Sequence, residues 1–248
     1  MQNRLLKLLI ICILFGCNSA QNDTSNSEEN VTPKVIHNGL SEAEKAEGWQ
    51  LLFDGKSTDQ WRGYQKEAFP EKGWNVVDNE LHVTKGGGDL ITKKQFGNFE
   101  LKIDFMVSDT ANSGIFYLAV EDSVEAIWKN APEYQILDNQ TYIKMYGDMT
   151  THLTAENYDL QAAPEDYTNA VGEWNTARIL HQDGHVEHWL NGKKAIEYDI
   201  GSEEWENLVQ KSKFAEYPNY GRAKMGHIGL QDHGHLVKFR NIKIRKLQ

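Results

Sequence analysis

The sequence predicts an all-β protein, a sandwich of two sheets with one or two short helices at its periphery. Short apolar or alternating runs recur along the chain, and turn residues separate them, as is typical of antiparallel sandwiches. The runs lie at 49–53, 74–77, 80–83, 99–107, 114–120, 134–137, 176–181, 186–190, 195–198, 227–231 and 237–244. Two dipeptides suited to type I′ hairpins, Asp183-Gly184 and Asn191-Gly192, join three of these runs into a meander.

The register of this meander follows if both hairpins have two-residue loops. Ile179 then pairs with His188 and His188 with Ala195, while Arg178 pairs with Trp189. Each face of the meander is partly apolar, so the alternation does not decide which face meets the core.

Two segments carry helix signals. Ser41 and Glu44 form the pattern of a capping box, and Gly48 is placed to end a helix of one or two turns. A second helix is expected from about 202 to 214, with Ser202 as its N-cap. We expect it to cover an end or an edge of the sandwich.

The N-terminus has the layout of a signal peptide. Arg4 and Lys7 precede an apolar run at 8–15, which is too short to span a membrane, since spanning takes about 20 residues. The segment 14–17, Leu-Phe-Gly-Cys, resembles a bacterial lipobox, which implies acylation of Cys17. An ordinary secretory signal is the alternative.

Three parts of the chain are therefore expected: a signal peptide at 1–17, a flexible linker at 18–40 and one domain at 41–248. The linker is rich in Asn, Ser, Thr, Asp and Glu, a composition that cannot compensate its own ordering entropy. The expected location is the cell envelope, lipid-anchored, facing the periplasm or at the cell surface, with the outer membrane favoured.

Charge and cysteine content exclude several functions. Removal of residues 1–17 leaves 24 basic residues against 36 acidic ones, a net charge near −12, with no basic block. Nucleic acid is therefore a poor partner, and a membrane would be contacted only through the lipid. Cys12 leaves with the signal peptide and Cys17 is acylated, which excludes thiol catalysis and cysteine-bound metal.

The densest polar pattern lies at 133–139. In a strand, Glu133 and Gln135 project from one face and Tyr134 and Ile136 from the other. A carboxylate beside an amide, with apolar residues behind them, suits the floor of a sugar groove. The alternative is an exposed sheet face with solvated polar residues.

A second strand near the C-terminus repeats this design. His227, Gln231 and His233 share one face, and Ile228 and Leu230 share the other. A histidine that titrates near neutrality can transfer protons, although a histidine in a strand is more often a hydrogen-bonded polar residue without a catalytic role.

A metal site is not expected, although the sequence does not exclude a bound divalent ion. Among the candidate ligands, the hairpin register puts His181 and His188 on one face and His185 on the other. No cofactor is expected. Several aromatic residues are candidates for stacking on sugar rings: Trp61, Tyr64, Trp74, Trp128, Tyr142 and Tyr146.

The spacing argues against a glycosidase with two catalytic carboxylates. Laminarinase-like sandwich enzymes carry Glu-x-Asp-x-Glu on one strand, whereas Glu133 is followed here by Gln135 and then by Asp138. An amide cannot titrate, so this mechanism is disfavoured.

The chain resembles the 3-keto-disaccharide hydrolase domain, a concanavalin-like jelly roll common in bacterial lipoproteins. The resemblance extends over about 48–246 and rests on blocks in the same order: 48–56 (GWQLLFDGK), 112–117 (NSGIFY), 133–138 (EYQILD), 172–175 (GEWN), 188–192 (HWLNG), 227–234 (HIGLQDHG) and 239–242 (FRNI).

The resemblance implies a substrate already oxidised at C3 of a glucoside by a separate oxidoreductase. The ketone acidifies the C2 hydrogen, so one base can remove it, the C1 leaving group is expelled, and water addition gives net hydrolysis. The hypothesis is Glu133 or His233 as the base, with Asp138 positioning a partner. Substrate contacts are assigned to Gln135, Gln231, His188, Asn112, Tyr158 and Trp128.

Two departures from the family pattern concern Leu118, where many relatives have Arg, and Ala155, near which many have Gly. The sequence is compatible with three functional interpretations. The favoured one is an enzyme acting on 3-keto-glycosides; the others are a non-catalytic carbohydrate-binding lipoprotein and a structural surface lipoprotein.

Overall fold

A computed structural model describes residues 37–121 and 125–248. The predicted signal peptide, Cys17 and the predicted linker up to residue 36 lie outside the described residues. Asn38, assigned to the linker from composition, is held to the domain: its backbone N–H donates to Asn241 Oδ1 at 2.6 Å, and its Oδ1 accepts the Asn241 N–H at 2.8 Å. Within the described ranges, no helix has the length and apolar character needed to cross a membrane.

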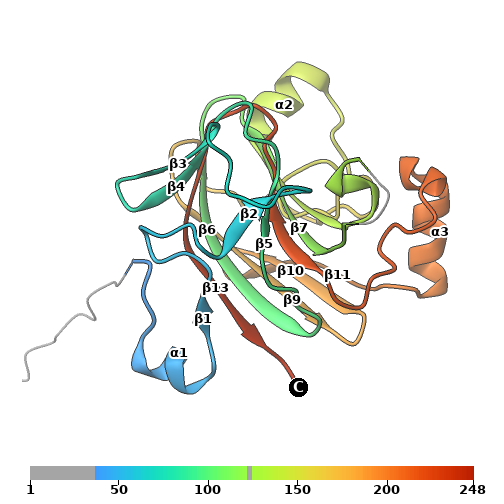
Figure 1. Cartoon of the computed structure of the whole chain (residues 1–248). Helices are drawn as coiled ribbons and strands as arrows, with labels where there is room; N and C mark the ends of the chain where they lie inside the picture. Colours follow the sequence, from blue (N-terminus) through green and yellow to red (C-terminus); the bar gives the residue numbers. More distant parts are fainter. Residues whose placement is uncertain (1–36, 122–124) are drawn as a thin grey trace, which may run out of the picture. The chain divides into compact units, whose positions relative to one another are not determined.

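The described residues form two antiparallel sheets, which confirms the two-sheet β-sandwich (Figure 1). The larger sheet has the order β11 (Lys193–Asp199), β10 (His185–Leu190), β9 (Asn175–Gln182), β6 (Phe99–Val107), β13 (Val237–Lys246), β4 (Glu80–Val83) and β3 (Trp74–Val77), with β1 (Gln50–Leu51) paired to β13. The smaller sheet has the order β2 (Trp61–Gly63), β5 (Leu90–Thr92), β12 (His227–Leu230), β7 (Asn112–Ala119) and β8 (Glu133–Leu137).

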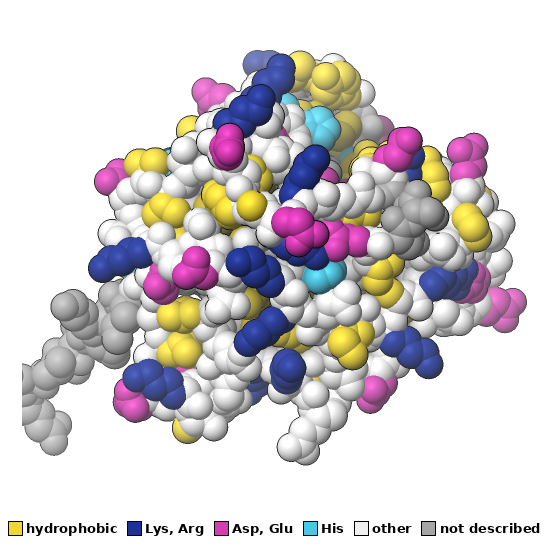
Figure 2. Space-filling model, viewed as in Figure 1, with side chains coloured by type: hydrophobic (Ala, Val, Ile, Leu, Met, Phe, Trp, Pro, Cys, Tyr) yellow, Lys and Arg dark blue, Asp and Glu magenta, His cyan; other side chains and the backbone are white. Residues whose placement is uncertain are grey.

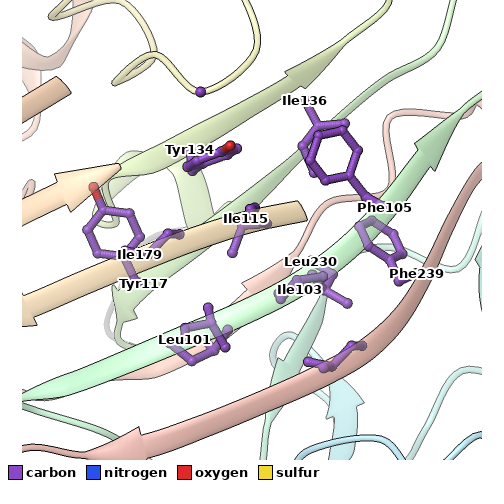
Figure 3. Close-up of a cluster of buried hydrophobic side chains, with 14 of the residues drawn as sticks. Leu101, Ile103, Phe105, Ile115, Tyr117, Tyr134, Ile136, Ile179, Leu230 and Phe239 are labelled. Atoms are coloured by element: carbon purple, nitrogen blue, oxygen red, sulfur yellow. The ribbon is translucent and has the colours of Figure 1, made fainter. Parts of the chain in front are cut away.

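The main core lies between the two sheets (Figure 3). Alternate residues of β6 point inward, and they meet the inward residues of β7 and β8 from the other sheet. The contributing side chains include Leu101, Ile103, Phe105, Ile115, Tyr117, Tyr134, Ile136 and Phe239. Burying one such side chain contributes roughly 1.5–3 kcal/mol, so this alternation fixes the register of both sheets.

The opposite face of the smaller sheet, here called the outer face, is divided between apolar and polar residues. A second, smaller apolar cluster covers part of it: Tyr64, Ile91, Phe116, Ala119, Ile127 and Ala131. Ile127 belongs to the 3₁₀ turn η1 (Ile127–Lys129), which lies between β7 and β8 in the chain. The rest of the outer face carries the polar residues described below.

The meander formed by β9, β10 and β11 has the predicted register except at one position. His188 pairs with Ile179 and Trp189 with Arg178, as expected. On the other side His188 pairs with Ile196 rather than Ala195, because the register of β10 against β11 shifts between His188 and Trp189. The face that bears Ile179 and His188 meets the core.

Both predicted helices are present. Ser41 caps α1 (Glu42–Ala46) with a complete capping box. Ser202 caps α3 (Glu203–Lys211), which ends before the expected residue 214 because Ser212 has an extended backbone and caps the 3₁₀ turn η2 (Lys213–Glu216).

A third helix, α2 (Asn139–Tyr146), was not expected. Asp138 caps it by accepting the Thr141 N–H at 3.1 Å, and Gly147 follows its end. The helix exposes three large apolar side chains, Ile143, Met145 and Tyr146. In Figure 2 hydrophobic side chains gather where Figure 1 places α2, at the top of the view.

Candidate functional site

A cavity of about 150 Å³ opens on the polar part of the outer face. Its lining comes from β7, η1, β8, η2 and the segments after β8 and β12: Asn112, Trp128, Glu133, Gln135, Tyr158, Lys213, Gln231 and His233. Seven of these eight residues were proposed as site residues from the sequence, and the structure brings them together. Lys213 was not.

The strand order explains why Gln135 and Gln231 meet. β7 lies between β12 and β8, and Gly114 of β7 pairs with Gln135. The Gln231 backbone N–H donates to the Gly114 carbonyl at 3.0 Å. Directly opposed residues share a face, and Glu133 lies two positions from Gln135, so Glu133 points to the outer face as well.

Glu133 is the most perturbed acid at this site. Its side chain is buried, with only 4% of the residue exposed. Loss of solvation is the main cause that raises the pKa of Glu133 to about 8; the Asp89 charge adds to the rise, while Lys213 and a hydrogen bond from Gln231 oppose it. At neutral pH the carboxyl is mostly protonated, and its conjugate base is correspondingly stronger than an ordinary glutamate.

The far side of the cavity is built by the segment that covers the free edge of β8. Ala155 donates its N–H to the Gln135 carbonyl at 3.0 Å, and Tyr158 donates to the Glu133 carbonyl at 3.1 Å. These bonds place the Tyr158 ring beside the carboxyl. Trp128 approaches from η1 and contacts Tyr217 edge-on, with ring centroids 5.3 Å apart. Two partly buried rings thus border the polar floor, as is common in pockets for small molecules.

His233 lies on an exposed loop whose preceding residue, Asp232, is firmly held. Asp232 Oδ2 accepts the backbone N–H groups of three consecutive glycines, 86–88, at 2.7–2.9 Å. The Asp232 N–H donates in turn to Asp89 Oδ1 at 2.9 Å. Desolvation and the neighbouring His235 lower the pKa of His233, so its imidazole is neutral at pH 7.

Comparison with known proteins identifies the family. The model of the 3-keto-alpha-glucoside-1,2-lyase-like domain matches residues 48–245. The chain belongs to this family. A protein from Bacteroides thetaiotaomicron named 3-keto-disaccharide hydrolase is 37% identical over 231 residues, which cover 82% of this chain and 79% of that protein. The chain is accordingly an enzyme of the hydrolase class.

Two crystal structures of proteins from Parabacteroides distasonis, each described as a "putative glycosyl hydrolase", share the fold of this 3-keto-alpha-glucoside-1,2-lyase-like domain. One is 34% identical with a TM-score of 0.80 and covers 86% of this chain and all of its own. The other is 31% identical with a TM-score of 0.63 and covers 80% of this chain and 99% of its own.

The structure separates His188 from the cavity of this lyase-like domain. His188 is completely buried between the sheets, where Nδ1 contacts the Ala155 carbonyl at 3.0 Å and Nε2 the Tyr117 hydroxyl at 2.8 Å. Burial lowers the pKa of His188 to about 3. A direct sugar contact by His188, predicted from the sequence, does not fit this position.

Asp138 also lies outside the lining. Its carboxylate accepts the Thr110 N–H at 2.9 Å and caps α2 through Thr141. The effect on the site is indirect: Tyr142 of α2 forms a side-chain hydrogen bond with Asn112, which lines the cavity. Asp138 therefore positions a helix rather than a reacting group.

The three histidines considered as metal ligands do not converge. His181 and His188 face the core, and His181 Nδ1 contacts the Gly97 carbonyl at 2.8 Å. His185 lies on the other face, where its ligand atom and those of Glu187 and Glu197 are within 4.8 Å of one another. Both glutamates already pair with Lys194, which reduces their affinity for a cation.

Leu118 and Ala155, the two departures from the family pattern, have φ of +55° and +73°. This left-handed region favours glycine and costs a residue with a Cβ about 1 kcal/mol. The Gly that the family resemblance leads one to expect near 155 would suit that backbone. Leu118 lies where β12 shifts its register against β7, and its side chain is buried, so the bulge holds it in this conformation.

Proposed function

We propose that this protein cleaves 3-keto-glycosides by removing the C2 proton and expelling the C1 substituent, with addition of water completing a net hydrolysis. The observation that carries this proposal is Glu133: a buried carboxyl with its pKa raised to about 8 at the floor of a polar cavity. A base of that strength is suited to abstraction of a proton acidified by a neighbouring ketone.

The reaction needs one base. Ionised Glu133 takes the C2 proton, the C2–H electrons form a C2=C3 bond, and the carbonyl π electrons move to the C3 oxygen. When the ketone re-forms, the C1=C2 bond is made and the C1–O bond breaks, and its electron pair leaves with the aglycone oxygen, which takes up a proton. Water then adds across the C1=C2 bond.

The lining supports this pathway over one with two catalytic carboxylates. Within residues 37–121 and 125–248, Glu133 is the one carboxylic acid that lines the cavity. Gln135 occupies the neighbouring position on the same face and cannot titrate. Asp89 influences the pKa of Glu133 but accepts the Asp232 N–H instead of reaching the cavity. The described lining therefore lacks the pair of carboxylic acids that a two-carboxylate glycosidase needs.

The names of the relatives fit both halves of this pathway. The family model is described as lyase-like and the Bacteroides protein as a hydrolase. Elimination followed by hydration reconciles the two terms, because elimination alone is a lyase reaction and the sum is a hydrolysis.

The proposal is tested by incubating the purified domain with 3-keto-trehalose and measuring glucose release, with unoxidised trehalose as the control substrate. We expect release from the ketone alone and a loss of about a hundredfold or more in Glu133→Gln. Glu173→Gln, an exposed glutamate away from the cavity, is the matched control. If His233→Ala loses activity and Glu133→Gln does not, the base is His233; the absence of release by the wild-type domain contradicts the proposal.

Two further proposals follow from the substrate and from the N-terminus. A C3 ketone arises by dehydrogenation of a sugar hydroxyl, so a separate oxidoreductase must act before this enzyme.

We also propose that acylation of Cys17 tethers the enzyme in the cell envelope, supported by Arg4, Lys7 and the apolar run that precedes the cysteine. Metabolic labelling with a palmitate analogue should mark the wild type and not Cys17→Ser, and labelling of both would contradict the tether.

A further inference from the structure

Lys213 lies at the cavity for reasons that can be traced through the chain. Ser212 ends α3, and its side chain caps η2 by accepting the Phe214 N–H at 3.1 Å. The Lys213 backbone N–H donates to Asp159 Oδ2 at 3.2 Å. This bond fixes η2 against the segment that carries Tyr158, so the Lys213 side chain extends along the aromatic wall into the cavity.

The Lys213 ammonium group is held by aromatic rings instead of by a carboxylate. Its Nζ lies 4.2 Å from the centroid of the Tyr158 ring and 5.1 Å from that of Trp128. Among the residues that the structure describes, no carboxylate oxygen lies within 4.0 Å of it. Lys194 and Lys243, by contrast, are paired with Glu197 and Glu44. Cation–π contacts keep the charge in place and leave its N–H donors available to a ligand.

Lys213 and Glu133 act on each other across the cavity. Lys213 opposes the rise in the pKa of Glu133. Desolvation lowers the pKa of Lys213, and the charges of Asp159 and then Glu133 oppose that fall. Both residues line the same cavity of about 150 Å³, so a sugar ring bound there can meet both.

We propose that Lys213 binds the C3 oxygen of the keto-sugar and stabilises the negative charge that this oxygen gains when Glu133 removes the C2 proton. The inference rests on the proposed function. C2 and C3 are bonded, so the oxygen that becomes charged lies a few ångströms from the proton that leaves. A fixed cation directed at developing charge lowers the barrier more than neutral amide donors such as Gln135 and Gln231 can.

The role requires a cation, and the charges of Asp159 and Glu133 favour the ammonium form of Lys213 against the desolvation that lowers its pKa. His233, the other titratable nitrogen in the lining, is neutral there because its pKa is lowered. A cation at the C3 oxygen also favours a ketone over an alcohol, since only the ketone accepts charge at this atom during the reaction. Lys213 thus contributes to the selection of oxidised substrates.

The experiment compares Lys213→Met, Lys213→Arg and Lys129→Met. Lys129 is the matched control: its Nζ also lies over Trp128, at 5.7 Å, but it pairs with Glu125 at 3.6 Å and does not line the cavity. Lys213→Met should lower kcat for 3-keto-trehalose by about a hundredfold with a smaller change in KM. Lys213→Arg should recover part of the lost kcat. Lys129→Met should change neither kcat nor KM by more than about threefold.

Two readouts separate this role from a structural one. The rising limb of the pH–rate profile should move to higher pH in Lys213→Met, because Lys213 lowers the pKa of Glu133. Exchange of the C2 hydrogen for deuterium, followed by NMR with a 3-keto-1,5-anhydro sugar that has no leaving group, should slow in parallel with kcat. Wild-type protein that neither exchanges nor cleaves contradicts the proposed function itself. If Lys213→Met exchanges the C2 hydrogen at the wild-type rate and the rising limb of its pH–rate profile does not move, only the role of Lys213 is overturned.

Discussion

Gly114 makes room for Glu133: a Cβ built on Gly114 would lie 2.1 Å from Glu133 Oε1. The two residues belong to neighbouring strands, β7 and β8, and Gly114 pairs with Gln135. The absent side chain lets the carboxyl lie flat against the sheet, where it is shielded from water. Gly114 does not have a left-handed backbone, so it is required here for space and not for conformation.

Replacing Gly114 with alanine should therefore displace the Glu133 carboxyl while leaving the backbone conformation permitted. We expect kcat/KM for a 3-keto-glycoside to fall by at least about tenfold, since a misplaced base loses the geometry of proton transfer. Gly97→Ala is the control, because its Cβ would meet its nearest atom, the Lys224 carbonyl oxygen, at 3.2 Å, and neither residue lines the cavity. A Gly114→Ala enzyme with wild-type turnover would show that Glu133 does not act from its observed position.

The activity should depend on pH through the ionisation of Glu133. The base form grows as pH rises through a pKa of about 8, so kcat/KM should increase about tenfold per pH unit below that value and then level off. The measurement is the initial rate of release over a range of pH with substrate well below KM. A rate limited by a base of ordinary glutamate pKa would instead be level from about pH 5 upward.

The burial of Glu133 should also reduce stability at neutral and higher pH. Its pKa is raised from 4.5 in the unfolded chain to about 8 in the folded protein, so between these values the folded state binds more protons. Its contribution to the free energy of unfolding is complete below 4.5 and is lost as pH rises through about 8.

Glu133→Gln removes this titration. The melting temperature of the variant relative to wild type should increase steadily from about pH 5 to pH 8 and reach several degrees, at about 2–4 °C per kcal/mol for a chain of this size. A difference that stays constant over this range would mean that Glu133 has similar pKa values in the folded and unfolded states.

Local pattern was sufficient to predict most of the fold. β3, β4 and β6 have the predicted bounds because their alternation or continuous apolar character is unambiguous. β2 and β5 were missed because three residues are too few to show a period. α2 was missed for another reason: Asp138 was assigned to a polar strand end, although Asp138 and Gly147 bracket eight residues as an N-cap and a C-terminal glycine would.

Site residues that alternate along a strand could be predicted from the sequence. Those whose position depends on tertiary contacts could not. Glu133, Gln135 and Gln231 follow from period-2 alternation, and β7 brings them together. Lys213 lay within the predicted helix at 202–214, and only the break at Ser212 directs it to the cavity. Both faces of the meander are partly apolar, so the sequence does not decide which face is buried. The face that bears His188 is the one that meets the core.

His188 should therefore matter for folding and not for substrate binding. Its replacement by alanine leaves a cavity and removes the ring that contacts the Ala155 carbonyl and one of the two partners of the Tyr117 hydroxyl, which keeps Tyr198, so we expect a loss of about 2–5 kcal/mol in the free energy of unfolding. Folded His188→Ala should retain wild-type KM. Urea unfolding and substrate titration at low temperature measure the two effects, and a normal stability with a raised KM would return His188 to the sugar site.

The same residue gives acid sensitivity with a defined sign. His188 has a pKa lowered to about 3 in the folded protein, whereas an exposed histidine in the unfolded chain titrates near 6.5. Between these values the unfolded state binds more protons, so stability is present above 6.5 and is lost as pH falls towards 3. His188→Ala should flatten the slope of the unfolding free energy over this range, relative to the slope of the wild type. Equal slopes in wild type and His188→Ala would show that His188 is not the group responsible.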